Sequence, residues 1–296
     1  MERSDNMKYT FINANTDLGT HIDGTNNGPI KITNNFKDYK ILNIEKENIS
    51  KDKNINNKTK NIKSINKFNN ELYYTVTDII KNNEFPIIVG GDHSLAIGSV
   101  LASNTQNEDI GIIWIDAHTD YNTIKSTITG NIHGLPLAVI NGHDEDKLSS
   151  FLIPKPKFIN HNRTVIVGAR SIDELELENL KKDNITVYTT DDIHKYGVNT
   201  ILDKAFKQAL GNNNKIHISY DLDVIDPAIC PGVSIPEKDG ISLEESYDIM
   251  NYIATKKEYI KSLDLVEYNP DYDIDNKSLN IAVNLINIFL NNNKNI

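Results

Sequence analysis

The sequence predicts an α/β protein with a mostly parallel sheet, and three features of its 296 residues support this fold class. Short β-rich runs alternate with helix-length stretches, as they do in βαβ units. Several of these runs, among them "FPIIVGG" and "TVIVGAR", are apolar throughout, which is typical of strands that helices cover on both faces. No internal repeat or shift in composition indicates a boundary, so we expect a single domain over residues 1–296.

The expected elements follow one another along the whole chain. The predicted strands, in order, cover residues 8–14, 39–44, 85–91, 110–118, 164–170, 185–190, 215–223 and 260–269. They are rich in Val, Ile, Tyr and Phe, which favour extended backbone. Between them lie stretches long enough for helices, near residues 66–82, 93–103, 171–182, 199–210, 243–256 and 276–291.

Residues 43–70 differ from the rest of the chain in composition. They are rich in Asn and Lys and contain almost no large apolar clusters. Such a segment cannot bury enough apolar surface to offset the entropy of ordering it. We therefore expect a surface excursion here, partly disordered, which leads into the helix predicted near 66–82.

Charge and cysteine content exclude several classes of protein. A formal net charge of -10 argues against general binding to nucleic acid or anionic membranes, because both partners would be repelled. No apolar run reaches the roughly 20 residues that a membrane-spanning helix needs, and the first residues contain no apolar signal-peptide core. The single cysteine, Cys230, excludes a disulfide framework within the chain. A cytoplasmic protein is the expectation.

Acids and imidazoles follow five of the predicted strands at the point where each strand ends. They are Asp92 and His93, Asp116 with His118 and Asp120, Asp173 and Glu176, Asp221 and Asp223, and Glu267. Because ligands of open parallel sheets bind outside the carboxyl ends of the strands, we expect these side chains to lie at one edge of the sheet.

The spacing of these residues predicts a metal centre. Alternate residues of an extended chain point to the same side, so Asp116, His118 and Asp120 can converge, and so can Asp221 and Asp223. Carboxylates crowded together without a counter-ion would be costly, and one or two divalent cations would remove that cost. Carboxylate and imidazole ligands without thiolates favour Mn²⁺ over a structural Zn²⁺ site. The number of acids favours two ions acting on one water.

Simpler interpretations exist for each motif taken alone. A D-x-D at the end of a strand is more often a helix cap or a turn, and a lone histidine is more often a hydrogen-bonded structural residue. Three strand ends carrying Asp-His, Asp-x-His-x-Asp and Asp-x-Asp are hard to explain as independent caps, and the conjunction favours the metal site.

Five motifs together resemble the ureohydrolase family, and within it the arginases most closely. They are "GGDHSLAIGS", "DAHTDYNT", "GNIHGLPL", "SYDLDVIDP" and "LDLVEYNP", and the resemblance runs from about Phe11 to the last predicted helix. It implies a three-layer α/β/α fold around an eight-stranded parallel sheet. It also implies a homo-oligomer, a trimer or a hexamer, with two Mn²⁺ ions in each subunit.

The resemblance implies a role for each residue of the metal site. His93, Asp116, Asp120 and Asp221 would hold one ion, and His118, Asp116, Asp221 and Asp223 the other. Asp116 and Asp221 would bridge the two ions together with a hydroxide, which Asp120 would orient. His133 matches the proton-shuttling histidine of the family, although a histidine in such a loop can simply be exposed.

The same resemblance implies how a substrate would be held. Glu267 matches the acid that pairs with the guanidinium group. Residues Asn122, Thr129 and Asn131 match positions that bind the α-carboxylate in arginases, and Asp173 and Glu176 match the acids that recognise the α-amino group. Alone, each of these two acids would be an ordinary residue at a helix N-terminus. Together, the carboxylate-binding and the amino-group-binding residues favour L-arginine over agmatine and predict hydrolysis to L-ornithine and urea.

One segment departs from the arginase pattern. In "DPAICPGVSIPEKDGIS", Ile235 stands where a threonine is common. Ile225, the residue directly before this segment, stands where a glycine is common. The alternatives are therefore another ureohydrolase (an agmatinase, guanidinobutyrase or formimidoylglutamase) or a non-catalytic family member that binds a metal. A one-metal deacetylase is a weaker alternative, because Asp120, Asp221 and Asp223 supply ligands for two ions.

Overall fold

Eight strands form one sheet in which every neighbouring pair is parallel. The computed structural model describes residues 7–52, 54, 57–58, 60–105, 109–143, 148–149, 152, 156–212 and 215–291. The sheet order is β2-β1-β3-β8-β7-β4-β5-β6. The strands are β1 (Lys8–Asn15), β2 (Lys40–Glu45), β3 (Glu84–Gly90), β4 (Gly111–Ile115), β5 (Thr164–Ala169), β6 (Thr186–Thr189), β7 (Ile216–Asp221) and β8 (Ile260–Val266). All eight predicted strands are thus present.

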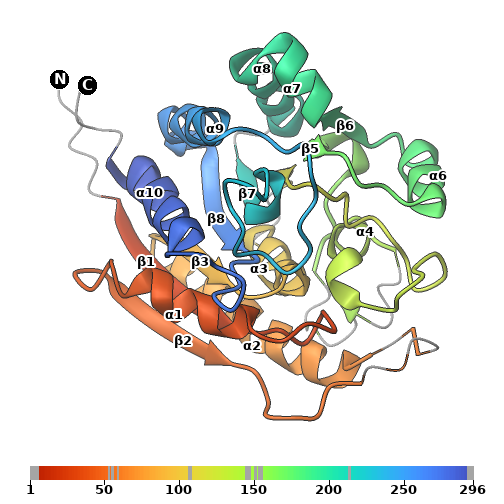
Figure 1. Cartoon of the computed structure of the whole chain (residues 1–296), viewed down its shortest axis with the longest axis vertical. Coiled ribbons are helices and arrows are strands. Elements are labelled where there is room, and N and C mark those ends of the chain that lie inside the picture. The colour runs from red at the N-terminus through yellow and green to blue at the C-terminus, as the bar shows by residue number, and fades with distance from the viewer. Residues whose placement is uncertain are drawn as a thin grey trace.

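Helices cover both faces of the sheet (Figure 1). One face carries α1 (Gly28–Thr33), α7 (Thr190–Tyr196), α8 (Val198–Leu210), α9 (Leu243–Thr255) and α10 (Lys277–Asn291). The other carries α2 (Ile62–Lys81), α3 (Ala96–Ser103), α4 (Pro136–Ile140) and α6 (Glu174–Lys182). This arrangement confirms the predicted three-layer α/β/α fold. None of the helices in the described residues is long and apolar enough to cross a membrane.

The apolar strands divide their side chains between two cores. Phe11 and Ile113 pack with one layer of helices, whereas their chain neighbours Ile12 and Ile112 pack with the other. Successive side chains of a strand point to opposite faces of the sheet. Strands that are buried on both faces therefore need apolar residues at every position, which explains the unbroken runs in the sequence.

The structure corrects the bounds predicted for the Asn/Lys-rich excursion. β2 extends to Glu45 and α2 begins at Ile62, so the excursion comprises residues 46–61 rather than 43–70. The early start of α2 reflects an apolar stripe that includes Ile65, Phe68 and Leu72, which packs into the core despite the surrounding Asn and Lys. Residues 53, 55, 56 and 59 of this excursion lie outside the described residues.

Within the described residues, three short helices were not predicted from the sequence. Helices α1 and α4 span six and five residues and carry a proline in their first turn. Segments this short complete too few turns to show an apolar period, although proline is favoured at a helix start. Helix α7 follows β6 directly through a capping box formed by Thr189 and Asp192.

The sheet order explains how residues from distant parts of the sequence meet. The five strands that deliver acids or imidazoles are β3, β8, β7, β4 and β5, and they are consecutive neighbours in the sheet. Since all strands are parallel, their carboxyl ends lie along one edge. The sequence could not show this adjacency, because β8 lies far from β3 along the chain.

Candidate metal and substrate site

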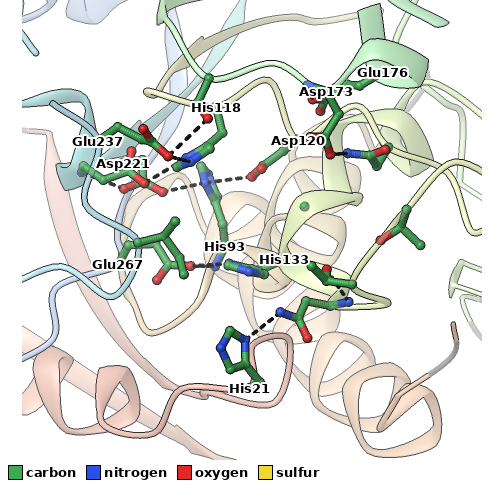
Figure 2. A pocket seen from close by; sticks show the side chains of 18 residues that line it. His21, His93, His118, Asp120, His133, Asp173, Glu176, Asp221, Glu237 and Glu267 are labelled. Carbon is green, nitrogen blue, oxygen red and sulfur yellow. Dashed lines mark hydrogen bonds and ion pairs between the residues drawn. The ribbon is translucent and has the colours of Figure 1, made fainter. Parts of the chain in front are cut away.

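The loops that follow these five strands enclose a cavity of about 270 Å³ (Figure 2). The predicted site residues that line it are His93, His118, Asp120, Asn122, Thr129, Asn131, His133, Asp173, Glu176, Asp221, Asp223 and Glu267. Asp116, the remaining predicted residue, is buried and contacts both metal-site histidines. The fold therefore brings together every residue predicted for the site. A cavity of this size suits a small molecule.

His93 faces three carboxylates. Its Nδ1 lies 3.1 Å from Asp116, 3.3 Å from Asp120 and 3.0 Å from Asp221. The ring is stacked on Trp114 with centroids 3.8 Å apart, and its Nε2 is 2.9 Å from the hydroxyl of Ser219. Both contacts fix the orientation of the imidazole, so that Nδ1 points at the acids.

His118 stands at the centre of a second group. Its Nδ1 lies 3.0 Å from Asp223 and 3.5 Å from Asp116. The other ring nitrogen, Nε2, lies 3.5 Å from Glu237. A metal-binding histidine usually pairs its second nitrogen with a carboxylate or carbonyl, which fixes its tautomer and orientation. Glu237 is placed to do this for His118.

Asp116 connects the two groups. Its Oδ2 faces His93, whereas its Oδ1 faces His118. The Trp114 indole donates a hydrogen bond of 2.9 Å to Oδ2, and the His118 backbone N–H donates one of 2.6 Å to Oδ1. A carboxylate with one oxygen toward each group has the geometry of a bridging ligand.

The pKa values of these groups reflect the crowding of charge. Burial raises the pKa of Asp120, Asp221 and Asp223, and the negative charge of their neighbours raises it further. Burial alone would also raise the pKa of Asp116, but the adjacent imidazoles of His118 and His93 lower it. Burial opposes ionisation of His93, yet the nearby acids hold its pKa above the ordinary value.

These residues fit a divalent cation. The 3.0–3.3 Å between His93 Nδ1 and its three acids is the spacing expected of ligands roughly 2.1 Å from a shared ion. Moreover, His93 Nδ1 is buried without hydrogen-bond geometry to any partner in the described residues. Two groups could each hold an ion: His93 with Asp116 and Asp120, and Asp116 with His118 and Asp223. A cation would compensate the repulsion that raises the carboxyl pKa values.

Glu267, which follows β8, lies next to His93 and His133, on the same side of the cavity as Asp221 (Figure 2). Its Oε1 accepts a hydrogen bond of 2.8 Å from the His93 backbone and lies 3.3 Å from His133 Nδ1. Its Oε2 is buried and has no hydrogen-bond partner within the described part of the chain. Glu267 has φ 65°, a left-handed conformation that a non-glycine residue adopts at some energetic cost. An unpaired buried carboxylate oxygen requires a donor, which a ligand can supply.

The acids at the start of α6 have structural contacts in addition to lining the cavity. The Glu176 Oε1 accepts a 2.7 Å hydrogen bond from the Tyr121 backbone, and its Oε2 accepts one from the Asp173 backbone in a capping box. The Asp173 carboxylate lies 3.3 Å from the Asn122 amide nitrogen. These contacts hold the loop after β4 against the start of α6.

Six residues that line the cavity were not among the predicted site residues: His21, Thr127, Gly134, Ser171, Ile235 and Glu237. A signal existed for Thr127, which lies in the same Thr-rich loop as Thr129. Glu237 lies within the segment that departs from the arginase pattern, and nothing in its spacing indicated a contact with His118. Of the two departures, Ile235 lines the cavity, whereas Ile225 is buried in the core.

Comparisons with known proteins agree with this geometry. The model of the Arginase family matches residues 7–290. An arginase of Bacillus subtilis is 36% identical over 247 residues, which cover 83% of this chain and 81% of the relative. The crystal structure of Entamoeba histolytica arginase in complex with L-ornithine superposes with a TM-score of 0.87 at 28% identity, over 96% of this chain and 99% of that one. A structure of the B. subtilis arginase gives a TM-score of 0.85 at 34% identity, over 98% and 99% of the two chains. By its fold, its His/Asp site and these matches, the chain belongs to the arginase family and is a hydrolase of the arginase type.

Proposed function

We propose that this chain is an arginase, which hydrolyses the guanidinium group of L-arginine to L-ornithine and urea with two Mn²⁺ ions per subunit. The observation that carries the proposal is the buried, unpaired Oε2 of Glu267 in the same cavity as the two His/Asp groups. A guanidinium offers a planar fork of donors, which a carboxylate matches. The proposed substrate also agrees with the L-ornithine bound by the E. histolytica relative.

The proposed ligand sets follow the two groups. His93, Asp116, Asp120 and Asp221 would hold one ion, and His118, Asp116, Asp221 and Asp223 the other. The oxygens of Asp116 on either side support a bridging role for this residue. When bound, the two cations supply the Lewis acidity that ionises water near neutral pH.

The chain's own residues would position the substrate and move protons. Glu267 holds the guanidinium, and Asp120 orients the attacking water. The bond between the guanidinium carbon and the side-chain nitrogen breaks, and water supplies the oxygen of urea and the proton of the leaving amine. His133 has a side chain that is 17% exposed and can exchange protons with solvent and deliver one to that amine.

The remaining cavity residues would select an amino acid. Asn122, Thr129 and Asn131 offer amide and hydroxyl donors to the α-carboxylate. Asp173 and Glu176 offer carboxylates to the α-ammonium. These two sets support L-arginine over agmatine, because agmatine has no carboxylate.

A substrate panel tests the proposal. The full chain, loaded with Mn²⁺ and assayed for metal content, is given L-arginine, agmatine, 4-guanidinobutyrate and N-formimidoyl-L-glutamate. The expected result is two Mn²⁺ per chain and a kcat/KM for L-arginine at least about 100-fold above the others, since buried polar groups reject analogues that leave them unpaired. Metal-loaded chain that turns over none of the four would instead indicate a non-catalytic family member.

A second candidate is another ureohydrolase, which one observation favours. Ile235 lines the cavity and places an apolar side chain where arginases commonly carry a hydroxyl. A higher kcat/KM for one of the other three substrates would establish this alternative.

Organisation and location are further proposals. We infer a single domain over the chain, a homo-oligomeric assembly (trimer or hexamer) and a cytoplasmic location. The one cysteine, which is buried, supports a location where disulfides are not needed. Light scattering coupled to size-exclusion chromatography measures the assembly directly.

A further inference from the structure

The Asn/Lys-rich segment contacts the loops that surround the cavity. Lys51 Nζ donates hydrogen bonds of 2.9 Å to the backbone carbonyls of Asp17 and Ile22. Lys58 Nζ donates one of 2.6 Å to the carbonyl of Thr127. The described residues of this segment thus bridge the loop after β1 and the loop of residues 127–131, which contains Thr129 and Asn131.

The segment and the 127–131 loop approach each other closely at Gly130. Its φ is +72°, and a Cβ at this position would lie 2.3 Å from the carbonyl oxygen of Asn57. Only glycine avoids both the unfavourable φ and this collision. The position of the 127–131 loop therefore depends on the segment packed against it.

Lys60 is the buried member of this contact. Lys60 is 5% exposed, whereas the other described residues between 46 and 61 are exposed or half-buried. Its ammonium donates hydrogen bonds to the carbonyl of Thr129 (2.5 Å) and to the Oδ1 of Asn131 (3.3 Å). Lysine is almost never this buried unless its charge is paired.

Lys60 forms no ion pair with any of the residues that the structure describes. Among the described residues, no carboxylate lies within ion-pair distance of its Nζ; the influence of Lys60 on the pKa of Asp52 is the smallest of the causes that lower it. Its two acceptors are neutral dipoles, and an ammonium has three donors. Burying an uncompensated cation is costly, so the site gains if an anion binds near it.

We propose that Lys60 is the residue that makes this cavity select substrates with an α-carboxylate. Lys60 is a positioning residue, because it does not line the cavity and acts through the 127–131 loop. It orients the carboxylate-binding groups of this loop and makes the electrostatic potential around them positive. The inference rests on the proposed function, because it takes the ligand of this loop to be the carboxylate of a guanidino amino acid.

The orientation of Asn131 supports this role. Because Lys60 holds Oδ1, the amide nitrogen is turned the other way, and it lies 2.8 Å from Nδ1 of His21, which lines the cavity. In Figure 2, His21 lies on the other side of His133 from Asp173 and Glu176. Asp173 and Glu176 thus lie on one side of His133 and the Asn131–His21 pair, with Lys60 behind it, on the other, which matches an α-ammonium and an α-carboxylate.

The test compares ligands that differ only in the carboxylate. Binding of L-ornithine and of putrescine to the Mn²⁺-loaded chain is measured by calorimetry for wild type, Lys60→Met and Lys60→Arg. In Lys60→Met, L-ornithine is expected to bind roughly 10- to 50-fold more weakly with putrescine changed by less than about 3-fold, as for the loss of a partly buried charge. Lys60→Arg keeps the charge and should retain most of the preference.

Two further variants separate charge from folding. Lys63→Met removes the same charge from an exposed position on α2 and should leave both affinities unchanged. Lys58→Met removes a contact to the 127–131 loop but not the buried charge, and should weaken binding of L-ornithine much less than Lys60→Met does. Equal losses for both ligands in Lys60→Met would make Lys60 merely structural and overturn the inference.

Kinetics give a second readout. In Lys60→Met, the KM for L-arginine should rise by a similar factor while kcat changes by less than about 3-fold, because the carboxylate interaction is the same in ground and transition states. Wild type that releases no urea would refute the proposed function, whereas the binding comparison would still decide the role of Lys60. Wild type that binds L-ornithine no better than putrescine would overturn the Lys60 inference itself.

Discussion

At the scale of single residues, the site contains two buried carboxylates on strained backbone. Asp120 and Glu267 both have positive φ, and both are buried. Backbone strain of this kind costs on the order of 1–3 kcal/mol per residue and persists where the surrounding contacts hold it. For Glu267 these contacts include a hydrogen bond of 2.9 Å from its backbone N–H to Gly91. The strain accompanies two carboxylates that line the same cavity.

The Asp120→Asn variant is expected to lose metal and activity. The amide keeps the shape of the side chain but removes a charged ligand 3.3 Å from His93. Metal content by mass spectrometry should fall below two per chain, and kcat for L-arginine should drop by at least about 100-fold. Asp191→Asn, an exposed change at the start of α7, serves as the control. Full activity with unchanged Mn²⁺ in Asp120→Asn would contradict the metal assignment.

Glu267→Gln should separate substrate binding from metal binding. The carbonyl oxygen of glutamine can still accept the hydrogen bond from His93, so the metal site should remain loaded. The charge opposite the guanidinium is lost, and kcat/KM should fall by about 100-fold, because hydrogen bonds between charged groups are the strong ones. Parallel metal analysis and kinetics check this; loss of metal would mean that Glu267 supports the metal site instead.

At the scale of elements, close packing of loops decides where the ligands point. Gly91 directly follows β3, two residues before His93, and its carbonyl accepts the hydrogen bond from Glu267. A Cβ on Gly91 would lie 1.7 Å from the carbonyl oxygen of Thr16 in the loop after β1. The glycine therefore lets two neighbouring strand ends come together beneath the site.

Gly91→Ala is expected to damage stability and metal binding together. Relieving the collision must shift backbone that carries His93 and Glu267, at about 3 kcal/mol or more. Ser242→Ala serves as the comparison: it removes the capping box of α9, should cost about 1 kcal/mol, and should leave Mn²⁺ content unchanged. Denaturant unfolding and metal analysis of both variants provide the measurements. Normal metal content in Gly91→Ala would show that the turn can adjust.

At the scale of the whole molecule, the sheet gathers negative charge along its central strands. The chain has a net charge of -10, and several of its acids are buried at one edge of the sheet. The folded state therefore contains repulsion between neighbouring carboxylates. Raised carboxyl pKa values record that repulsion. Anything that binds the folded state and supplies positive charge there stabilises the fold.

The stability of the metal-free chain should therefore fall as pH rises. Folding raises the pKa of Asp120, Asp221 and Asp223. A raised pKa contributes stability below the ordinary value, near pH 4, and this contribution is lost as pH rises through the raised value. Asp116 has the opposite sign: its lowered pKa adds stability that is fully present above about pH 4 and stays constant at higher pH.

The measurement is the melting temperature between pH 5 and 9, with chelator and with Mn²⁺. The metal-bound chain should show a flatter dependence, so the difference between the two curves should widen with pH; ligand deprotonation favours metal binding in the same direction. A difference that stays constant or narrows with rising pH would contradict a cation site formed by these carboxylates.

The sequence by itself determined the strands, the edge at which polar residues follow them, and the chemistry of the metal site. Periodicity and residue type carry this information, because a strand buried on both faces must be apolar and a cation requires acids and imidazoles. The family motifs pointed to Glu267, His133 and the loop with Thr129 and Asn131, all of which line the cavity.

Tertiary structure alone decided the rest. It made β8 the neighbour of β3, directed Glu237 to His118, and placed Ile235 in the cavity but Ile225 in the core. It also buried Lys60 behind Asn131, although the sequence around Lys60 indicates a solvated excursion. The physical reason is that burial and pairing of charge depend on packing between segments distant in the chain, which local composition does not encode.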